Sequence, residues 1–564
     1  MEALDWLVIG VFFLALIGII VWVVRQKQND SADYFLGGRD ATWLAIGASI
    51  FASNIGSEHL IGLAGAGASS GMAMAHWEIQ GWMILILGWV FVPFYTRSMV
   101  YTMPEFLERR YNPQSRTILS VISLVSYVLT KVAVTVYAGG LVFQQVFGIK
   151  ELWGIDFFWI AAIGLVVLTA LYTIFGGMKS VLYTSVLQTP ILLLGSLIIL
   201  VLGFKELGGW DEMMRVCGAV TVNDYGDTMT NLIRSNDDAN FPWLGALIGS
   251  AIIGFWYWCT DQLIVQRVLS GKNEMEARRG TIFGAYLKLL PVFLFLIPGM
   301  IAFALHQKYI GAGGEGFLPM LANGTANADA AFPTLVAKLL PAGVKGLVVC
   351  GILAALMSSL ASLFNSSAML FTIDFYKRFR PETPEKKLVG IGQVATVVIV
   401  ILGILWIPIM RSVGDVLYTY LQDVQSVLAP GIAAAFLLGI CWKRTSAQGG
   451  MWGLIAGMVI GLTRLGAKVY YSNAGEVADS TFKYLFYDMN WLFFCGWMFL
   501  FCIIVVIVVS LATKAPTAEK IQGLVFGTAT KEQKAATRAS WNHWDIIHTV
   551  IILAITGAFY WYFW

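Results

Sequence analysis

The chain has 564 residues, of which 58% are hydrophobic and only 13% are charged. Soluble globular proteins are about half apolar and about a quarter charged, so this composition excludes that class. The net charge of +3 is too small to indicate a nucleic-acid partner. Because a membrane-spanning helix needs about 20 apolar residues, the chain is expected to be an all-α polytopic membrane protein.

Fourteen apolar segments follow one another along the chain, and each is long enough to be a transmembrane helix. The first, an uncharged run from Trp6 to Val24, is longer than the apolar core of a signal peptide, and we expect it to be retained. The segments lie at about 4–24, 42–70, 74–98, 117–147, 154–175, 180–203, 243–268, 281–306, 344–376, 388–411, 415–439, 448–470, 490–512 and 545–563.

Orientation is predicted from the loops. An even number of helices places both termini on one side of the membrane. If that side is extracytoplasmic, most of the 37 Lys and Arg fall in cytoplasmic loops, as the positive-inside rule requires. We therefore expect a multi-pass protein of the plasma (cell inner) membrane with both termini extracytoplasmic. The polar loop 204–242 is then outside, and the Lys-rich loop 513–544 is a cytoplasmic, solvated linker rather than a regulatory segment.

Two of the apolar segments are interrupted by small and polar residues. The second contains Ala48-Ser-Ile-Phe-Ala-Ser-Asn-Ile-Gly-Ser-Glu-His59, and the segment 243–268 contains Gly254-Phe-Trp-Tyr-Trp-Cys-Thr-Asp-Gln262. They are five helices apart, so two successive five-helix units would have opposite topology. Paired broken helices in inverted repeats indicate a transporter binding site near the midplane. Tight helix packing explains the small residues alone, but it does not explain the polar ones.

Ionisable residues inside apolar segments are rare and usually face a water-filled path or a partner. Glu78 and Lys288 lie well within their helices and could pair, directly or through a solute's hydroxyls. For Lys131 and Asp261, a structural salt bridge is as plausible as a functional role. The full set of such residues is Glu58, His59, Glu78, Lys131, Asp261 and Lys288.

The segment 351–376 carries adjacent hydroxyl side chains, in Ala355-Leu-Met-Ser-Ser359 and Asn365-Ser-Ser367. Such hydroxyls can bond to carbonyls of their own helix. Alternatively, they are neutral oxygen ligands for a small monovalent cation, completed by carbonyls of a broken helix.

Several ordered motifs resemble those of the sodium/solute symporter family, and within it the sodium–glucose cotransporter branch, of bacterial type. The family motifs are Tyr34-Phe-Leu-Gly-Gly-Arg39, Met103-Pro-Glu-Phe106, Tyr172-Thr-Ile-Phe-Gly-Gly-Met-Lys-Ser180 and Phe364-Asn-Ser-Ser367. The branch is indicated by Trp256-Tyr-Trp-Cys-Thr-Asp-Gln-Leu-Ile-Val-Gln-Arg267, Tyr286-Leu-Lys288 and Trp442-Lys-Arg444.

This resemblance implies a LeuT-type fold, a 5+5 inverted repeat with one extra N-terminal and three extra C-terminal helices. The implied division of the chain is 1–41 (extra helix and cytoplasmic loop), 42–203 (first repeat), 204–242 (extracytoplasmic loop), 243–439 (inverted second repeat) and 440–564 (extra helices with loop 513–544).

The resemblance also implies the functional residues. Sugar-binding positions would be Asn54, His59, Glu78, Tyr257, Trp258, Lys288 and Gln422. Gate residues would be Leu63, Trp77, Tyr257 and Tyr418. Sodium would be held by carbonyls of Ala52, Ile55 and Ala355 and by the hydroxyls of Ser358 and Ser359.

The chemistry of this set favours a neutral solute. Sugar hydroxyls both donate and accept, so a mixture of amide, carboxylate, imidazole and ammonium groups suits them. An anionic or cationic solute would instead require one dominant opposite charge, whereas Glu78 and Lys288 balance each other.

Four residues depart from the family pattern. Gly254 and Gly81 stand where a polar side chain often occurs, which leaves the exact sugar open. Ser185 replaces an Asp, and Ala361 lacks a hydroxyl, at positions that belong to a second ion site in resembling proteins. We therefore expect one sodium ion per solute.

The resulting hypothesis is a sodium-coupled symporter that imports a neutral, glucose- or galactose-like sugar by alternating access. The alternatives are a sodium-coupled symporter of another solute, such as inositol, another polyol, a carboxylate or an amino acid, and a sugar sensor that accumulates nothing. An enzyme is not expected, because the sequence has no nucleophile–base pair, metal motif or phosphate loop. The expected partners are the sugar, sodium and the lipid bilayer, with no nucleic acid.

Overall fold

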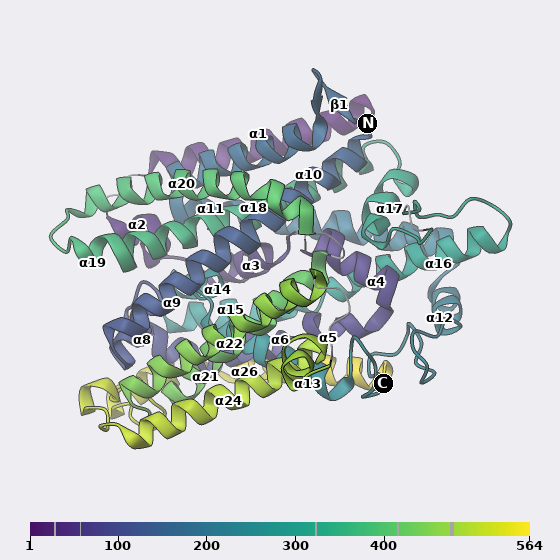
Figure 1. The fold of residues 1–564 in the computed structure, drawn as a ribbon. Coiled ribbons are helices and arrows are strands. Elements are labelled where there is room, and N and C mark those ends of the chain that lie inside the picture. The colour runs from purple at the N-terminus through teal and green to yellow at the C-terminus, as the bar shows by residue number, and fades with distance from the viewer. Residues whose placement is uncertain (27–29, 57, 322–323, 414–416, 474–478) are drawn as a thin grey trace.

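A computed structural model describes residues 1–564 except 27–29, 57, 322–323, 414–416 and 474–478. Within helices it also leaves out the side chains of 129–130, 141, 145, 406–407, 409–413, 417–421 and 472–473. The molecule is a bundle of long helices, and both termini lie at the end of the bundle that carries α12, α17 and the last turns of α16 (Figure 1). The position of the termini relative to the membrane remains a prediction.

Helices make up almost all of the described chain. In the first part they are α1 (Ala3–Arg25), α2 (Ser31–Leu36), α3 (Trp43–Asn54), α4 (Ala64–Ser70), α5 (Ala75–Glu78), α6 (Gly81–Ile86), α7 (Val92–Ser98), α8 (Met103–Arg110), α9 (Pro113–Ser126), α10 (Ala133–Phe147), α11 (Phe157–Leu207) and α12 (Trp210–Gly218).

The second part continues with α13 (Trp243–Gly254), α14 (Gln262–Leu269), α15 (Glu274–Lys288), α16 (Ile297–Gly311), α17 (Ala331–Leu339), α18 (Val344–Met369), α19 (Lys377–Phe379), α20 (Glu385–Val413), α21 (Leu417–Cys441), α22 (Ala447–Asn473), α23 (Thr481–Lys483), α24 (Trp491–Ala512), α25 (Lys531–Ala539) and α26 (His543–Tyr562).

Short segments of tighter or wider helix join these elements. The 3₁₀ turns are η1 (Gly37–Arg39), η3 (Gly71–Met74), η8 (Ala328–Ala330) and η11 (Ala518–Lys520). The π-helical segments are η2 (Glu58–Leu63), η4 (Leu87–Phe91), η5 (Tyr127–Val132), η6 (Phe255–Thr260), η7 (Val292–Leu296), η9 (Leu370–Tyr376) and η10 (Tyr484–Asp488). The two short strands β1 (Glu151–Leu152) and β2 (Ile155–Asp156) form one antiparallel hairpin.

Eleven helical stretches in the described residues are long and apolar enough to cross a membrane, and two shorter apolar helices, Trp43–Asn54 and Ala133–Gln144, accompany them. The chain is therefore a polytopic helical membrane protein. α11 has 51 residues and covers two of the expected segments, 154–175 and 180–203. The two parts are separated by a bend at Gly177, whose φ is 53°. A Cβ at Gly177 would lie 2.4 Å from the carbonyl oxygen of Tyr34, so the bend needs glycine. The count of fourteen transmembrane helices remains a prediction.

Both interruptions predicted in the apolar segments are present. α3 ends at Asn54, Ile55 has an extended backbone, and η2 begins at Glu58. In the other segment, η6 ends at Thr260 and Asp261 is extended. Its carboxylate caps α14 by accepting a hydrogen bond from the backbone N–H of Leu263 at 2.9 Å.

Segment 513–544 lies against the bundle and is not a solvated linker throughout. The backbone N–H of Phe526 donates to the carbonyl of Ile440 at 2.9 Å, and Lys520 Nζ donates to the carbonyl of Glu108 at 2.7 Å. Val525 is buried. These contacts hold the connection between α24 and α26 against the ends of α21 and α8.

Candidate functional site

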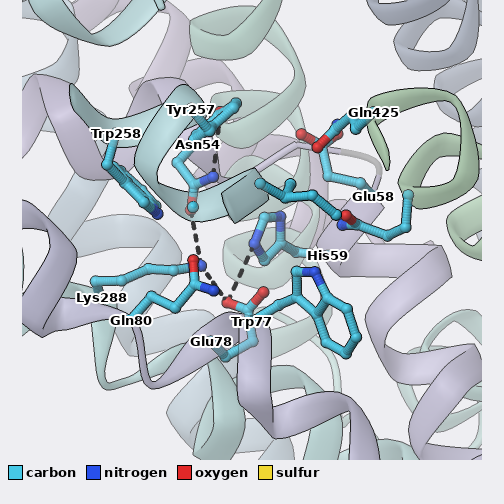
Figure 2. Close-up of a pocket in the computed structure, with 13 residues that line it drawn as sticks. Asn54, Glu58, His59, Trp77, Glu78, Gln80, Tyr257, Trp258, Lys288 and Gln425 are labelled. Atoms are coloured by element: carbon cyan, nitrogen blue, oxygen red, sulfur yellow. Dashed lines mark hydrogen bonds and ion pairs between the residues drawn. The ribbon is translucent and has the colours of Figure 1, made fainter. Parts of the chain in front are cut away.

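The two broken helices both contribute residues to one pocket (Figure 2). α3 and η2 contribute one wall, α5 a second, and η6, the end of α15 and α21 the others. All seven predicted sugar-binding residues line this pocket: Asn54, His59, Glu78, Tyr257, Trp258, Lys288 and Gln422. Their positions span more than 350 residues of sequence, so tertiary packing alone brings them together.

A charged and polar network crosses the pocket. Lys288 Nζ donates to Glu78 Oε2 at 2.6 Å and to Asn54 Oδ1 at 3.2 Å. His59 Nε2 lies 3.3 Å from the same oxygen of Glu78, and Asn54 Nδ2 donates to Tyr257 Oη at 3.2 Å. The Glu78–Lys288 pair expected from the sequence is therefore present. Both side chains are buried, and their charges compensate each other.

Besides His59 Nε2, which faces Glu78, three buried polar atoms at the pocket have no hydrogen-bond partner among the described residues. They are His59 Nδ1, Trp77 Nε1 and Gln422 Oε1. Buried polar atoms nearly always find a partner, so an imidazole nitrogen, an indole donor and an amide acceptor are all available to a bound molecule. Together they suit hydroxyl groups, which donate and accept at one atom.

The open space between the lining side chains is only about 50 Å³. Ligand pockets usually measure about 300–1,000 Å³. Here the lining groups bond to one another instead, as Lys288 does to Glu78 and Asn54. A ring-sized solute would have to separate these groups and replace their mutual hydrogen bonds with its own.

Three further polar side chains line the pocket and were not among the predicted site residues: Glu58, Gln80 and Gln425. The sequence marks Glu58 as an ionisable residue within an apolar segment, without assigning it to the solute site. Gln80 Nε2 donates to the carbonyl of Ser250 at 2.8 Å, and a Cβ on Gly254 would lie 2.5 Å from Gln80 Oε1. The amide of Gln80 thus occupies the space that a side chain at position 254 would fill. Its nearness to Glu78 in sequence was the only available signal.

The predicted gate residues have different surroundings. Trp77 lines the pocket and stacks on Trp491, with ring centroids 5.5 Å apart. Tyr257 lines the pocket as well, and the ammonium of Lys131 lies 4.7 Å from the centroid of its ring. Leu63 is fully buried but is not among the residues that line the pocket. Tyr418, the fourth predicted gate, lies on α21 in the stretch whose side chains are not described.

The broken end of α3 lies against the hydroxyl-rich part of α18. A Cβ on Gly56 would lie 3.0 Å from Ser359 Oγ, and Ser53 Oγ is 2.7 Å from Ser362 Oγ. The predicted sodium ligands thus come from these two facing elements. Ser185 lies on α11, and its Oγ is 3.3 Å from the Oγ of Ser358.

A second, smaller cavity joins the solute pocket to these hydroxyls. Glu58, Tyr257 and Gln425 line both cavities, and Ser53 and Ser359 line only the second. Within the described part of the chain no group of three or more His, Cys, Asp or Glu side chains could hold a metal ion. Around Ser359 lie hydroxyl oxygens and the carboxylate of Glu58, since a Cβ on Gly56 would lie 2.7 Å from Glu58 Oε2 and 3.0 Å from Ser359 Oγ. Oxygen ligands of this kind suit a hard cation rather than a soft transition metal.

The model of the sodium:solute symporter family matches residues 34–457 of this chain. The chain belongs to the sodium:solute symporter family. It is a sodium-coupled symporter and not an enzyme, and sodium is the co-transported ion.

Relatives of this symporter include the sodium/myo-inositol cotransporter 2 of Mus musculus. It is 36% identical over 542 residues, which cover 94% of this chain and 80% of the relative. Sodium/glucose cotransporter 4 of Danio rerio is also 36% identical, over 92% of this chain and 80% of the relative. The fold is similar to that of a Na⁺-coupled sialic acid symporter, with a TM-score of 0.72, 22% identity, and coverage of 92% and 99% of the two chains.

Proposed function

We propose that this symporter imports a neutral, polyhydroxylated ring solute, a hexose or an inositol, together with sodium. The observation that carries the proposal is the balanced pair of Glu78 and Lys288 in one pocket with His59 and Asn54. The opposite charges of Glu78 and Lys288, 2.6 Å apart, compensate each other, while each group still offers hydrogen bonds to hydroxyls. The second carboxylate of the pocket, Glu58, disfavours an anionic solute.

Hexose and inositol are equally supported at this level. The 36% identity to relatives named for myo-inositol and for glucose is the same. Both solutes present a ring of hydroxyls with an apolar face, which the ring of Trp258 can contact. The polar contacts of Gln80, whose amide lies next to Gly254, would then select between a hexose and an inositol.

The proposal includes the site roles and the architecture that go with them. Asn54, His59, Glu78, Lys288 and Gln422 would bond the solute, with the rings of Tyr257 and Trp258 beside it. Sodium would bind the carbonyls and hydroxyls of the predicted set: Ala52, Ile55, Ala355, Ser358 and Ser359. The architecture would be the LeuT-type 5+5 inverted repeat over 42–203 and 243–439, in the plasma membrane, with both termini extracytoplasmic.

The test is uptake into proteoliposomes of labelled glucose, galactose and myo-inositol, with sialic acid as the anionic comparison, each with and without an inward sodium gradient. We expect saturable, sodium-dependent uptake of at least one neutral solute. Uptake of sialic acid in preference to all three neutral solutes would contradict the proposal. Binding of a sugar without accumulation under any gradient would support a sensor instead.

The site assignment is tested by Glu78→Ala and Gln422→Ala. Each leaves polar partners unmatched, at roughly 1–3 kcal/mol apiece, so we expect about a five- to hundredfold loss of solute affinity. Glu212→Ala is the control, because that carboxylate pairs with Arg215 at 2.7 Å on the surface of α12. Wild-type uptake in both pocket variants, at equal amounts of folded protein, would overturn the assignment.

A further inference from the structure

Away from the solute pocket, a larger cavity of about 530 Å³ lies where α3, α15 and α26 meet. Aromatic rings form much of its wall: Trp43 packs edge-to-face on Phe283, and Tyr286 packs in the same way on His548. Trp544 completes this aromatic lining. None of these residues takes part in the solute site.

The cavity lies at one end of a membrane-spanning helix. α26 runs from His543 to Tyr562, next to the C-terminus, and its 20 residues span about 30 Å. The cavity contacts only the first turns of α26, so it lies at the membrane boundary opposite the C-terminus. Trp43 and Trp544 are 41% and 58% exposed there, as is typical of tryptophans at a membrane interface.

Next to the cavity, the outer face of α26 is apolar and exposed. Ile547, Val550 and Ile551 are 41%, 57% and 40% exposed. In a transmembrane helix such a face contacts lipid chains. The cavity is therefore continuous with a surface that hydrocarbon covers.

The polar groups of the cavity include one cation and one anion. Arg279 Nε donates to Asp545 Oδ1 at 3.1 Å, and Asp545 Oδ2 accepts from the backbone N–H of Asn542 at 2.9 Å. Among the bonds of the described residues, the two Nη atoms of Arg279 donate to no acceptor, and the side chain is 33% exposed. The guanidinium can thus form a bidentate contact with a phosphate while Asp545 keeps its position.

The charge balance selects the kind of headgroup. Because Asp545 compensates Arg279, the cavity has no excess positive charge for a polyanion. An ammonium group can bind over the faces of aromatic rings, and Trp is the most favourable of them. A headgroup with one phosphate and one ammonium matches this cavity, because the phosphate can bind the outer edge of the Arg279 guanidinium and the ammonium can bind over the neighbouring rings.

We propose that this cavity binds the headgroup of a zwitterionic phospholipid of the phosphatidylethanolamine class. Its phosphate binds Arg279, its ammonium binds among the rings of Trp544 and Tyr286, and its acyl chains follow the exposed face of α26. The lipid would then bridge α3, α15 and α26, which are far apart in sequence.

The test uses the purified, delipidated full chain and native mass spectrometry with added phosphatidylethanolamine, phosphatidylglycerol or inorganic phosphate. We expect phosphatidylethanolamine to be retained about tenfold more than phosphatidylglycerol, and inorganic phosphate not to displace it. Equal retention of the two lipids, or displacement by phosphate alone, would overturn the proposal in favour of a simple anion site.

Variants separate the site from general lipid adhesion. Arg279→Gln should reduce phosphatidylethanolamine retention about tenfold, and Arg380→Gln, which removes an exposed cation beyond α19, should leave it unchanged. Since Arg279→Gln also unpairs Asp545, Trp544→Ala provides an independent variant at an exposed ring, with a several-fold loss expected. Retention equal to wild type in both cavity variants would refute the site.

Discussion

Gly254 and Gly81 both lack a side chain near the pocket, but their neighbours differ, and so does the structural reason for each glycine. At Gly254 the missing group is replaced by Gln80, whose amide lies where a Cβ would be. At Gly81 a Cβ would lie 2.8 Å from the carbonyl of Ala285, so that glycine allows α6 to approach α15 closely. Only Gly254 therefore bears directly on the solute.

Gly254→Ala should weaken solute binding without preventing folding. The new methyl group forces Gln80 to move and to lose its hydrogen bond to Ser250, and one such bond contributes about 1 kcal/mol. We expect KM for the transported solute to rise several-fold with little change in maximal rate. Gly164→Ala is the matched control, because a Cβ there meets nothing within 4 Å. Equal KM values in the two variants would mean that Gln80 does not contact the solute.

At the scale of elements, η5 is connected to the second broken helix by one buried ion pair. Lys131 Nζ lies 2.8 Å from Asp261 Oδ2, and Tyr127 also donates to Asp261. The same ammonium lies over the ring of Tyr257, one of the predicted gate residues. The sequence left Lys131 and Asp261 open between a structural pair and a functional one. The structure shows an ion pair beside the Tyr257 ring, and we propose that the pair positions this ring.

Lys131→Met should uncouple transport more than it reduces binding. Loss of the cation frees the Tyr257 ring, and a cation–π contact contributes about 0.5–2 kcal/mol. We expect the accumulation ratio in proteoliposomes to fall several-fold while binding of labelled solute stays within about twofold.

Because Lys131→Met also leaves the buried Asp261 carboxylate unpaired, the double variant Lys131→Met/Asp261→Asn serves as its control. It should show the same uncoupling with better stability, and Lys131→Arg should restore coupling. A parallel loss of binding and accumulation in the double variant would indicate a purely structural pair.

For the whole molecule, the coupling ratio depends on what surrounds the α18 hydroxyls. Ser185 offers Ser358 a neutral hydroxyl at 3.3 Å, where resembling proteins carry a carboxylate, and Ala361 offers no oxygen side chain. The predicted set of neutral oxygens suits one monovalent cation. At about 2.3 kcal/mol per charge per 100 mV plus roughly 1.4 kcal/mol for a tenfold gradient, one ion supports about 500-fold accumulation.

The expected coupling is therefore one sodium and one charge per solute. The measurement is the sodium dependence of uptake together with the charge moved per solute in proteoliposomes at a set potential. A Hill coefficient near one, with loss of sodium dependence in Ser359→Ala, would agree with this ratio. Two charges per solute with a Hill coefficient clearly above one would refute it and would make Ser185 a ligand of a second ion.

The sequence alone determined the membrane class and the interrupted helices, and its resemblance to a known family indicated the seven residues that line the pocket. Long uncharged runs, small polar interruptions and ordered motifs are local properties of the chain, and local properties can be read residue by residue. The Glu78–Lys288 pair could also be expected, because two buried opposite charges in one bundle are costly unless they meet.

Only the tertiary structure decided which distant residues complete these features. Four contacts join parts of the chain separated by more than 80 residues: Gln80 beside Gly254, Lys131 over Tyr257, Ser185 beside Ser358, and segment 513–544 against α8 and α21. No periodicity or motif encodes such contacts. They follow from how the helices pack, because a side chain's partner in a bundle is set by the crossing of helices and not by sequence distance.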